Sequence, residues 1–437
     1  MSRKFELRAG VAREIISPPK GIYLIGYGDR TKGNLGIHDE LTATALLLDD
    51  GERRIALVAC DLLAINKFVV ERVQEQLRET AEVIISCSHT HAGPLTYADW
   101  RSGPRRRAYV QRLVARIVRA VRRAAEHLTP VTLSGGQTVA DIAVNRRERQ
   151  PDGSLDIGVN PGGPRDREVG VVQLRTARGV PLATIVNFAC HGTVLGPANR
   201  QVSADWIGAM RTQVEAQLGG LMLFLQGATA DLNPVRNVLG PDEQPWEAVE
   251  TLGKQVADAV AALCKNGLTT LPSAPLELRR RELWLPLEAK VTSNRPPRTY
   301  RQILLAQSGL PPFLSWAVDW LLWHRYPWRS RIEARQGRWT VPLQINVLRA
   351  GALGLVTLGA ETFTEIGQSL KAVAPTPHTL FASVTDGCIG YLPTASAHAA
   401  GGPEVDLFSY FYRYPGRFAA ESAALAIQAV SEMWEAM

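Results

Sequence analysis

The chain of 437 residues is 46% hydrophobic and 21% charged, an ordinary balance for a globular protein with a sizeable core. Its formal net charge is +7, but no recognisable nucleic-acid-binding module accompanies the basic residues, so no nucleic-acid partner is expected. The N-terminal residues lack the apolar segment of a signal peptide, and no run approaches the ~20 apolar residues that span a bilayer. The five cysteines are scattered without a CxxC pair, which argues against a disulfide framework. We therefore expect a cytoplasmic protein.

The predicted elements begin with alternating strands and helices. Strand patterns cover 41–48, 54–63 and 82–87, and a helical pattern covers 68–80. The runs at 54–63 and 82–87 are almost wholly apolar, as expected of strands that are buried on both faces. The second of these runs continues directly into the sequence SHTHAGP.

An arginine-rich helix is predicted next. Eight arginines and no acid lie between Arg105 and Arg123, and apolar residues recur at helical spacing on the opposite face. The basic face could meet anionic lipid or an acidic substrate, but a solvated helix face is the simpler interpretation. The segment 145–167 is rich in Gly, Pro, Asp and Arg and is predicted to be a long loop.

The rest of the chain continues the alternation. Strand patterns cover 169–174, 182–189, 221–225, 281–286, 344–349, 353–358 and 378–384. Helical patterns cover 206–218, 246–264 and the segment from 418 onward. Residues from about 295 to 340 form a tryptophan- and arginine-rich segment that is predicted to be a helical insert. This insert is interpreted either as a lid or lipid-facing surface, or as a helical hairpin packed on the core.

Each cluster of polar, catalysis-compatible residues follows a predicted strand. The clusters read SHTH, CHGT, GATADLNP, GAET and GYLPT. Strand ends that open into loops are where α/β folds gather their active sites, so these five ends are expected to converge on one pocket. No linker divides the chain. The sequence therefore predicts a single large α/β catalytic domain over residues 1–437, with layered β-sheets flanked by helices and the active site at strand ends.

His89 and His91 stand two residues apart at the first of these strand ends. If the strand conformation continues, both side chains leave the same face. Such a pair suits two ligands of one metal ion, or one ligand beside an acid–base group. His191 has a similar position, and imidazole with carboxylate is the ligand set that zinc favours in hydrolytic sites. Spacing does not choose among the candidate carboxylates, which are Asp61, Asp205, Asp231, Glu361 and Asp386.

The motifs of the chain, in their order, resemble those of the neutral/alkaline (non-lysosomal) ceramidase family. SHTHAGP is similar to the family signature THTHSGP, and RAGVAREIISPPKG, GYGDR and IHDELTATALLL resemble the family's N-terminal signature. The resemblance continues through VACDLLAI, VNRRER, NFACHGTVLG, SADWIGAMR, FLQGATADLNP, GAETFTEIG and DGCIGYLPT. Members of the family are zinc amidases that cleave the N-acyl bond of ceramide. The resemblance therefore implies a zinc-dependent amidohydrolase with one Zn²⁺ per chain and a lipid or other small N-acyl substrate.

The resemblance also implies roles for individual residues. The implied zinc ligands are His89, His191, Glu361 and Tyr391. His91 matches a residue beside the metal that assists proton transfer or holds the oxyanion. Arg146 matches an arginine that contacts the substrate or the developing charge. The structural alternatives are a packed aromatic side chain for Tyr391, a helix cap for Glu361 and one more exposed arginine for Arg146.

Three features depart from the familiar ceramidases. Asn233 stands where those enzymes carry a serine. Pro403 stands where they carry a second tyrosine, whose role is vacant or shifts to Tyr410, Tyr412 or Tyr414. The familiar ceramidases are also secreted and have a C-terminal β-sandwich domain, neither of which is indicated here. These departures bear on the substrate more than on zinc hydrolysis.

Two alternative functions follow from these departures. The first is a zinc hydrolase of an ester or a different amide, with the same site and another pocket. The second is a lipid-surface-binding protein with a degenerate site, which would use the arginine-rich helix and the tryptophan-rich insert for peripheral membrane contact. Candidates at all four zinc-ligand positions argue against the second alternative.

Overall fold

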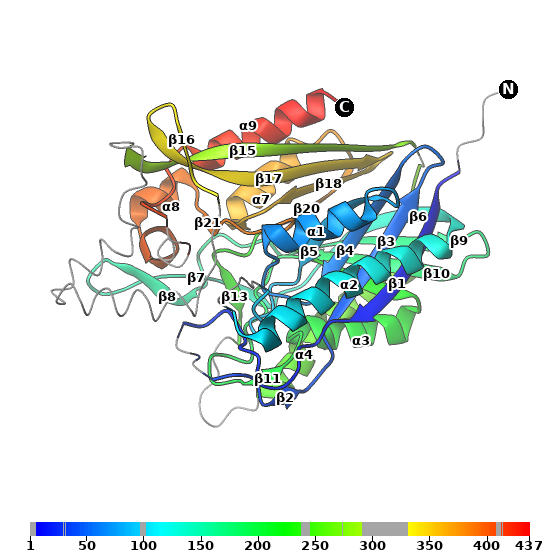
Figure 1. Cartoon of the computed structure of the whole chain (residues 1–437), viewed down its shortest axis with the longest axis horizontal. Helices are drawn as coiled ribbons and strands as arrows, with labels where there is room; N and C mark the ends of the chain where they lie inside the picture. Colours follow the sequence, from blue (N-terminus) through cyan, green and yellow to red (C-terminus); the bar gives the residue numbers. More distant parts are fainter. Residues whose placement is uncertain are drawn as a thin grey trace.

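The structure is a computed structural model that describes residues 6–28, 30, 32–96, 102–236, 245–272, 274–290, 331–407, 412 and 414–437. Two β-sheets are stacked face to face, and helices cover the outer face of each (Figure 1). This four-layer arrangement of helices, sheet, sheet and helices confirms the predicted α/β fold class. None of the described helices is both long and apolar enough to cross a membrane.

The larger sheet contains nine described strands in the order β12-β10-β9-β6-β1-β3-β4-β5, with β14 beside β6. Their bounds are β1 Arg8–Ile15, β3 Thr42–Asp49, β4 Arg54–Cys60, β5 Glu82–Cys87, β6 Thr129–Val139, β9 Glu168–Thr176, β10 Pro181–Phe188, β12 Leu221–Gln226 and β14 Thr269–Leu271. β1 and β6 pair through only two residues of each strand, so the sheet divides there into two halves. One half contains the parallel pair β4–β5, and the other contains the parallel pair β10–β12.

The smaller sheet has the order β15-β17-β18-β20, with β16 beside β17. Its strands are β15 Leu276–Lys290, β16 Glu333–Arg335, β17 Arg338–Ala350, β18 Leu353–Leu358 and β20 His378–Ala382. The facing sides of both sheets share one buried apolar cluster, to which Leu46, Leu57, Leu348 and Leu355 belong. Burial of this cluster away from water is what holds the two sheets together.

Helices complete the outer layers and short elements connect them. α1 (Lys67–Leu77), α2 (Pro104–Glu126), α3 (Trp206–Leu218) and α4 (Pro245–Asn266) pack on the larger sheet. α7 (Thr364–Ala372) and α9 (Ser422–Glu435) pack on the smaller sheet. The short elements are β2 Gly36–Ile37, β7 Ala143–Arg149, β8 Leu155–Asn160, β11 Gln201–Val202, β13 Leu232–Pro234, β19 Glu361–Thr362, β21 Tyr391–Leu392, α8 Ala395–Ala400 and the π-helix η1 Pro403–Leu407.

The prediction of a long loop at 145–167 is wrong. Most of this segment belongs to a β-hairpin of β7 and β8, which pair antiparallel. β8 lacks a buried face, because none of its residues is fully buried and Ile157 and Val159 are exposed. Apolar residues do alternate in β8, at Leu155, Ile157 and Val159, but the Gly, Pro, Asp and Arg residues around this short run are typical of a loop.

The predicted helical insert at 295–340 falls mainly on 291–330, outside the described residues. Its last part differs from the prediction, because β16 and the beginning of β17 are strands. They pair antiparallel across a two-residue turn at Gln336 and Gly337, where φ is 50° and 77°. Positive φ at both positions is the requirement of a type I′ hairpin turn.

The arginine-rich face of α2 is anchored on strand β1. Arg116, Arg119 and Arg123 place guanidinium nitrogens 2.6, 3.2 and 3.0 Å from the carboxylate of Glu14. The Glu14 side chain is only 4% exposed, whereas the three arginines are 39% to 61% exposed. Burial opposes the ionisation of Glu14, but the arginines lower the pKa of its carboxyl below 4.5. The arginine-rich face is therefore partly exposed to solvent, and three of its arginines also pair with one buried acid.

We expect Glu14→Gln to lower the free energy of unfolding by about 1–3 kcal/mol near neutral pH, because charged hydrogen bonds are lost. The folded-state pKa of Glu14 lies below the unfolded value. Its stabilisation is therefore fully present above about pH 4.5 and disappears as the pH falls through the folded pKa. Urea unfolding of both proteins along a pH series measures this difference.

Glu82→Gln is the matched control, because the Glu82–Arg53 pair at 3.4 Å is 44% and 40% exposed. Exposed pairs contribute about 0–1 kcal/mol, so this variant should remain close to the wild type. A Glu14→Gln difference that stays constant down to acid pH would contradict the assignment.

Candidate active site

His89 and His91 lie in the loop that follows β5. The strand does not continue through the pair, because β5 ends at Cys87 and His89 has a φ of 62°. The turn nevertheless brings the two rings together, with centroids 5.1 Å apart. Left-handed backbone costs a non-glycine residue roughly 1–2 kcal/mol, and such strain is concentrated at functional sites. Main-chain hydrogen bonds from His89 to Leu62 and from His91 to Gly192 hold the loop in place.

His191 reaches the same point from the end of β10. Its ring centroid lies 4.8 Å from that of His89 and 5.5 Å from that of His91. The ligand atoms of these three histidines lie within 4.8 Å of one another. Nδ1 of His89 is 2.7 Å from the carbonyl oxygen of Leu63, and Nδ1 of His191 is 2.7 Å from that of Leu232. A ring that donates from Nδ1 keeps Nε2 as a lone-pair donor, the form that binds metals.

Glu361 and Tyr391 complete the predicted ligand set. They are register partners in the parallel pair β19–β21. Oε2 of Glu361 lies 3.2 Å from Nε2 of His89 and 3.8 Å from Nε2 of His191. The Tyr391 hydroxyl interacts with the Glu361 carboxylate and the Arg146 guanidinium. All four predicted zinc ligands are therefore gathered at one point, although they come from distant parts of the chain.

The electrostatics of the cluster favour neutral imidazoles beside a carboxylate. Burial, with the charge of Arg146, lowers the pKa of His191 to about 4. Burial, with His89 and His191 nearby, lowers the pKa of His91 well below its usual range. Burial opposes the ionisation of Glu361, but the two neighbouring histidines hold the pKa of its carboxyl well below its usual range. At neutral pH His91 and His191 are therefore neutral while Glu361 is charged.

These side chains fit a metal ion. Nε2 of His89, Oε2 of Glu361 and both ring nitrogens of His91 are buried and have no hydrogen-bond partner among the described residues. A buried polar group that is left unpaired costs about 1–3 kcal/mol. A divalent cation at this point would satisfy such groups, and two imidazoles with a carboxylate are a typical zinc donor set.

Arg146 extends from β7 into the same region, and its side chain is 5% exposed. Nη1 lies 3.5 Å from Nε2 of His191 and 3.4 Å from Oδ1 of Asn233. Nη2 is buried, and within the described part of the chain it has no hydrogen-bond partner. The structural alternative of one more exposed arginine does not hold, because Arg146 is buried beside the histidines.

Glu404, in η1, is a site residue that the sequence analysis missed. Its buried carboxylate accepts a hydrogen bond from Nε of Arg146 at 2.9 Å and one from Nη1 of Arg147 at 2.8 Å. Burial alone would lower the pKa of Arg146, but Tyr391 and Glu404 raise it above its usual value. No motif marks Glu404, and only the path of the chain after Pro403 brings it to Arg146.

Tyr412 also reaches the metal-ligating cluster. Its hydroxyl donates to Oε1 of Glu361 at 3.0 Å, and burial raises the pKa of that hydroxyl well above its usual value. Tyr414 instead donates to a backbone carbonyl at 2.8 Å, and Tyr410 lies outside the described residues. Of the two described candidates, Tyr412 is therefore the one that the structure places on a predicted ligand.

The GYGDR motif forms the wall beside His91. The Tyr27 ring meets the His91 ring edge-on at 5.1 Å, and Nη1 of Arg30 donates to the His91 carbonyl oxygen at 2.7 Å. Gly26 has a φ of 117°, and a Cβ at this position would lie 2.5 Å from Nδ1 of His91. Only glycine allows this approach, so Gly26 is required for the position of the His91 ring.

The other four candidate carboxylates are used within the fold. Their donors are Arg211 for Asp61, the Trp206 backbone for Asp205, Thr364 for Asp231 and the Ile85 backbone for Asp386. Glu361 is thus the only one of the five that lies against the histidines.

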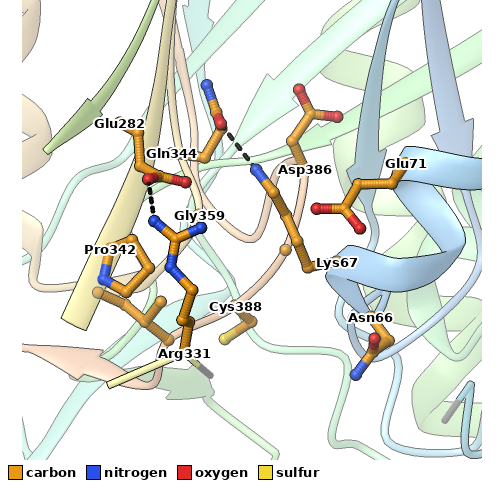
Figure 2. A pocket seen from close by; sticks show the side chains of 12 residues that line it. Asn66, Lys67, Glu71, Glu282, Arg331, Pro342, Gln344, Gly359, Asp386 and Cys388 are labelled. Atoms are coloured by element: carbon orange, nitrogen blue, oxygen red, sulfur yellow. Dashed lines mark hydrogen bonds and ion pairs between the residues drawn. The ribbon is translucent and has the colours of Figure 1, made fainter. Parts of the chain in front are cut away.

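A separate cavity of about 120 Å³ lies beside α1 (Figure 2). Figure 2 shows Lys67 and Arg331 on different sides of it. Lys67 donates to Gln344 at 2.8 Å, and Arg331 is paired with Glu282 at 2.7 Å. None of the four predicted zinc ligands lines this cavity, so it is not the proposed catalytic pocket.

Comparison with known proteins assigns the chain to one family. The profile described as "Neutral/alkaline non-lysosomal ceramidase, N-terminal" matches residues 8–228, which is just over half of the chain. "Neutral ceramidase 1" of Arabidopsis thaliana is 27% identical over 219 residues, which cover 45% of this chain and 27% of that protein. "Neutral ceramidase" of Oryza sativa subsp. japonica is 25% identical over 248 residues, which cover 52% and 31%. The match therefore spans about a third or less of the length of these curated relatives.

The fold is shared with a solved structure over almost the whole chain. Neutral ceramidase from Pseudomonas aeruginosa superposes with a TM-score of 0.73 at 18% identity. The superposition covers 99% of this chain and 75% of that structure. Because the family profile matches more than half of its residues, the chain belongs to the neutral/alkaline non-lysosomal ceramidase family.

Proposed function

We propose that the chain is a zinc-dependent amidohydrolase that cleaves an N-acyl amide bond. The observation that carries the proposal is the convergence of His89, His191 and Glu361 on one buried point, where the facing atoms of His89 and Glu361 have no hydrogen-bond partner among the described residues. Family membership and the names of the relatives, which are neutral ceramidases, support this class of reaction.

Four side chains would hold the ion: His89, His191, Glu361 and Tyr391. When bound, zinc supplies Lewis acidity and lowers the pKa of a coordinated water from ~15.7 toward ~7. The contacts of Nδ1 with the Leu63 and Leu232 carbonyls fix the ring orientations of the two histidines. Tyr412 orients the Glu361 carboxylate through its second oxygen. These contacts would fix the orientation of three of the four proposed ligands.

His91 is the proposed acid–base residue. Its ring is neutral at physiological pH, and its two nitrogens are without hydrogen-bond partners in the described part of the chain. It can therefore accept a proton from the attacking water and then donate it to the leaving amine. The contacts of its backbone with Gly192 and Arg30 keep the ring at the edge of the metal-ligating cluster.

Arg146 is the proposed donor to the carbonyl oxygen of the substrate as negative charge develops there. Glu404 and Asn233 hold its guanidinium, and Nη2 remains without a partner among the described residues. A donor that is fixed in advance in a buried site stabilises an oxyanion without reorganisation. Asn233 supplies an acceptor for Arg146 at the position where familiar ceramidases have a serine.

The proposed substrate is ceramide or a related N-acyl amide, which would yield a sphingoid base or another amine and a fatty acid. The names of the relatives support ceramide. Asn233 in place of serine favours testing other N-acyl amides and esters beside it, because an amide side chain cannot provide a nucleophilic or donating hydroxyl.

We expect the purified protein to bind about one zinc ion per chain and His191→Ala to weaken zinc binding on the order of 100-fold or more. Elemental analysis and competition with a chelator measure this. His378→Ala is the matched control, because His378 is buried like His191 but lies at the start of β20. A wild type without zinc affinity, or equal losses in both variants, would refute the assignment.

We also expect the zinc-loaded protein to hydrolyse at least one N-acyl amide from a panel of ceramides, fatty-acyl amino acids and simple esters. A chelator should abolish this turnover, and added zinc should restore it.

Arg146→Lys should lower kcat by about 10²–10³, because a planar donor to the oxyanion is lost. Release of the fatty acid under saturating substrate measures kcat.

Arg149→Lys controls for the charge-preserving change, because Arg149 is exposed and donates to a backbone carbonyl within its own hairpin. Its turnover should equal that of the wild type. Turnover that survives complete removal of zinc would exclude the proposed chemistry, and cleavage of esters alone would replace the amide substrate.

A further inference from the structure

The carboxylate of Asp231 anchors the segment that carries Glu361. Oδ1 of Asp231 accepts hydrogen bonds from the backbone N of Thr364 at 2.9 Å and from its Oγ1 at 2.8 Å. Thr364 is the first residue of α7 and follows Glu361 by three positions. The backbone N of Ala230 also donates to the carbonyl oxygen of Thr362 at 3.0 Å. The short stretch around Asp231 therefore fixes the turn on which Glu361 is carried.

The other oxygen and the main chain of Asp231 hold the segment of Arg146. Nδ2 of Asn145 donates to Oδ2 of Asp231 at 3.1 Å, and the backbone N of Arg146 donates to the Asp231 carbonyl oxygen at 2.8 Å. Asn145 also accepts from the backbone N of Arg147 at 3.0 Å. The base of the Arg146 side chain is thus tied to the same aspartate as the Glu361 segment.

His191 rests on the adjacent residue. Its Nδ1 lies 2.7 Å from the carbonyl oxygen of Leu232. Asn233, one residue further, contacts Nη1 of Arg146. The segment 231–233 therefore contacts the parts of the chain that carry three site residues: Arg146 in β7, His191 after β10 and Glu361 in β19.

From these contacts we infer that Asp231 is a positioning residue that sets the placement of Glu361 relative to Arg146 across the site. Its two oxygens accept hydrogen bonds from Thr364 and Asn145, so Asp231 is assigned a positioning role and not that of a metal ligand. The inference rests on the proposed function. An asparagine at this position would place its NH₂ group opposite either Thr364 or Asn145. Both of these residues donate hydrogen bonds to Asp231, so one of the two contacts would then face a donor with a donor. The carboxylate is therefore needed to hold the two segments together.

The Glu361 side of this link is tested at Thr364. Thr364→Val removes the hydroxyl donor and keeps the shape of the side chain, whereas Thr364→Ser keeps the donor. We expect the valine variant to bind zinc about tenfold more weakly, as for the loss of an outer-shell partner, and the serine variant to recover affinity to within about twofold. Chelator competition measures the affinity, and the visible spectrum of the Co²⁺-substituted protein reports the ligand geometry.

The Arg146 side is tested with Asp231→Asn, which should lower kcat by about 10–100-fold with a smaller change in KM. Asp49→Asn is the control, because Asp49 is also 2% exposed and accepts from Arg8 and Arg54 at the far end of β3. This control should lose stability but keep zinc affinity and kcat.

Wild-type zinc affinity, cobalt spectrum and kcat in both Thr364→Val and Asp231→Asn would overturn the inference while leaving the proposed function intact. Equal losses in Thr364→Val and Thr364→Ser would also overturn it, because the hydroxyl would then be irrelevant. A wild type that binds no zinc would overturn the proposed function and this inference together.

Discussion

The site depends on one close contact between two buried polar atoms. Oε2 of Glu361 lies 3.2 Å from Nε2 of His89, both atoms are buried, and neither has a hydrogen-bond partner in the described structure. Burying two such atoms without a partner costs free energy, unless a proton or a metal cation lies between them. The surrounding contacts aim the atoms at each other, because the opposite edge of the His89 ring is held by Leu63 and the second oxygen of Glu361 by Tyr412. The arrangement is that of a group of side chains that could hold a metal ion.

The layered fold explains how these atoms meet. The larger sheet divides at the short β1–β6 pairing, and each half contributes one histidine-bearing loop. The two loops are joined by the bridge between Thr90 and Gly192. The smaller sheet adds Glu361 and Tyr391 through β19 and β21, which follow its parallel strands. Apolar burial between the layers supplies the stability, and the loops absorb the strain of the positive φ at His89.

Much of this site could be predicted because its residues lie in short motifs directly after apolar strands. His89, His191 and Glu361 each follow such a strand, so the general rule for α/β folds predicts that these strand ends converge. The choice of Glu361 among five carboxylates, and that of Tyr391, came from the family resemblance, because spacing does not choose between them. The sequence did not predict the role of Glu404, nor that Tyr412 rather than Tyr414 contacts Glu361. Both depend on tertiary contacts and not on a local sequence pattern. The β7–β8 hairpin was missed for a different reason. β8 alternates apolar and polar residues over only six positions, and the Gly-, Pro- and Asp-rich sequence around it is typical of a loop.

X-ray absorption spectroscopy of the zinc-loaded protein tests the proposed zinc coordination most directly, because it counts the imidazole ligands of the ion. Coordination by the four proposed ligands predicts nitrogen and oxygen neighbours only, at about 2.0–2.2 Å, with the multiple-scattering signal of two imidazoles. These are the rings of His89 and His191, while His91 stays outside the coordination sphere as the acid–base residue. A sulfur neighbour at about 2.3 Å, or the signal of three imidazoles, would contradict the proposed ligand set.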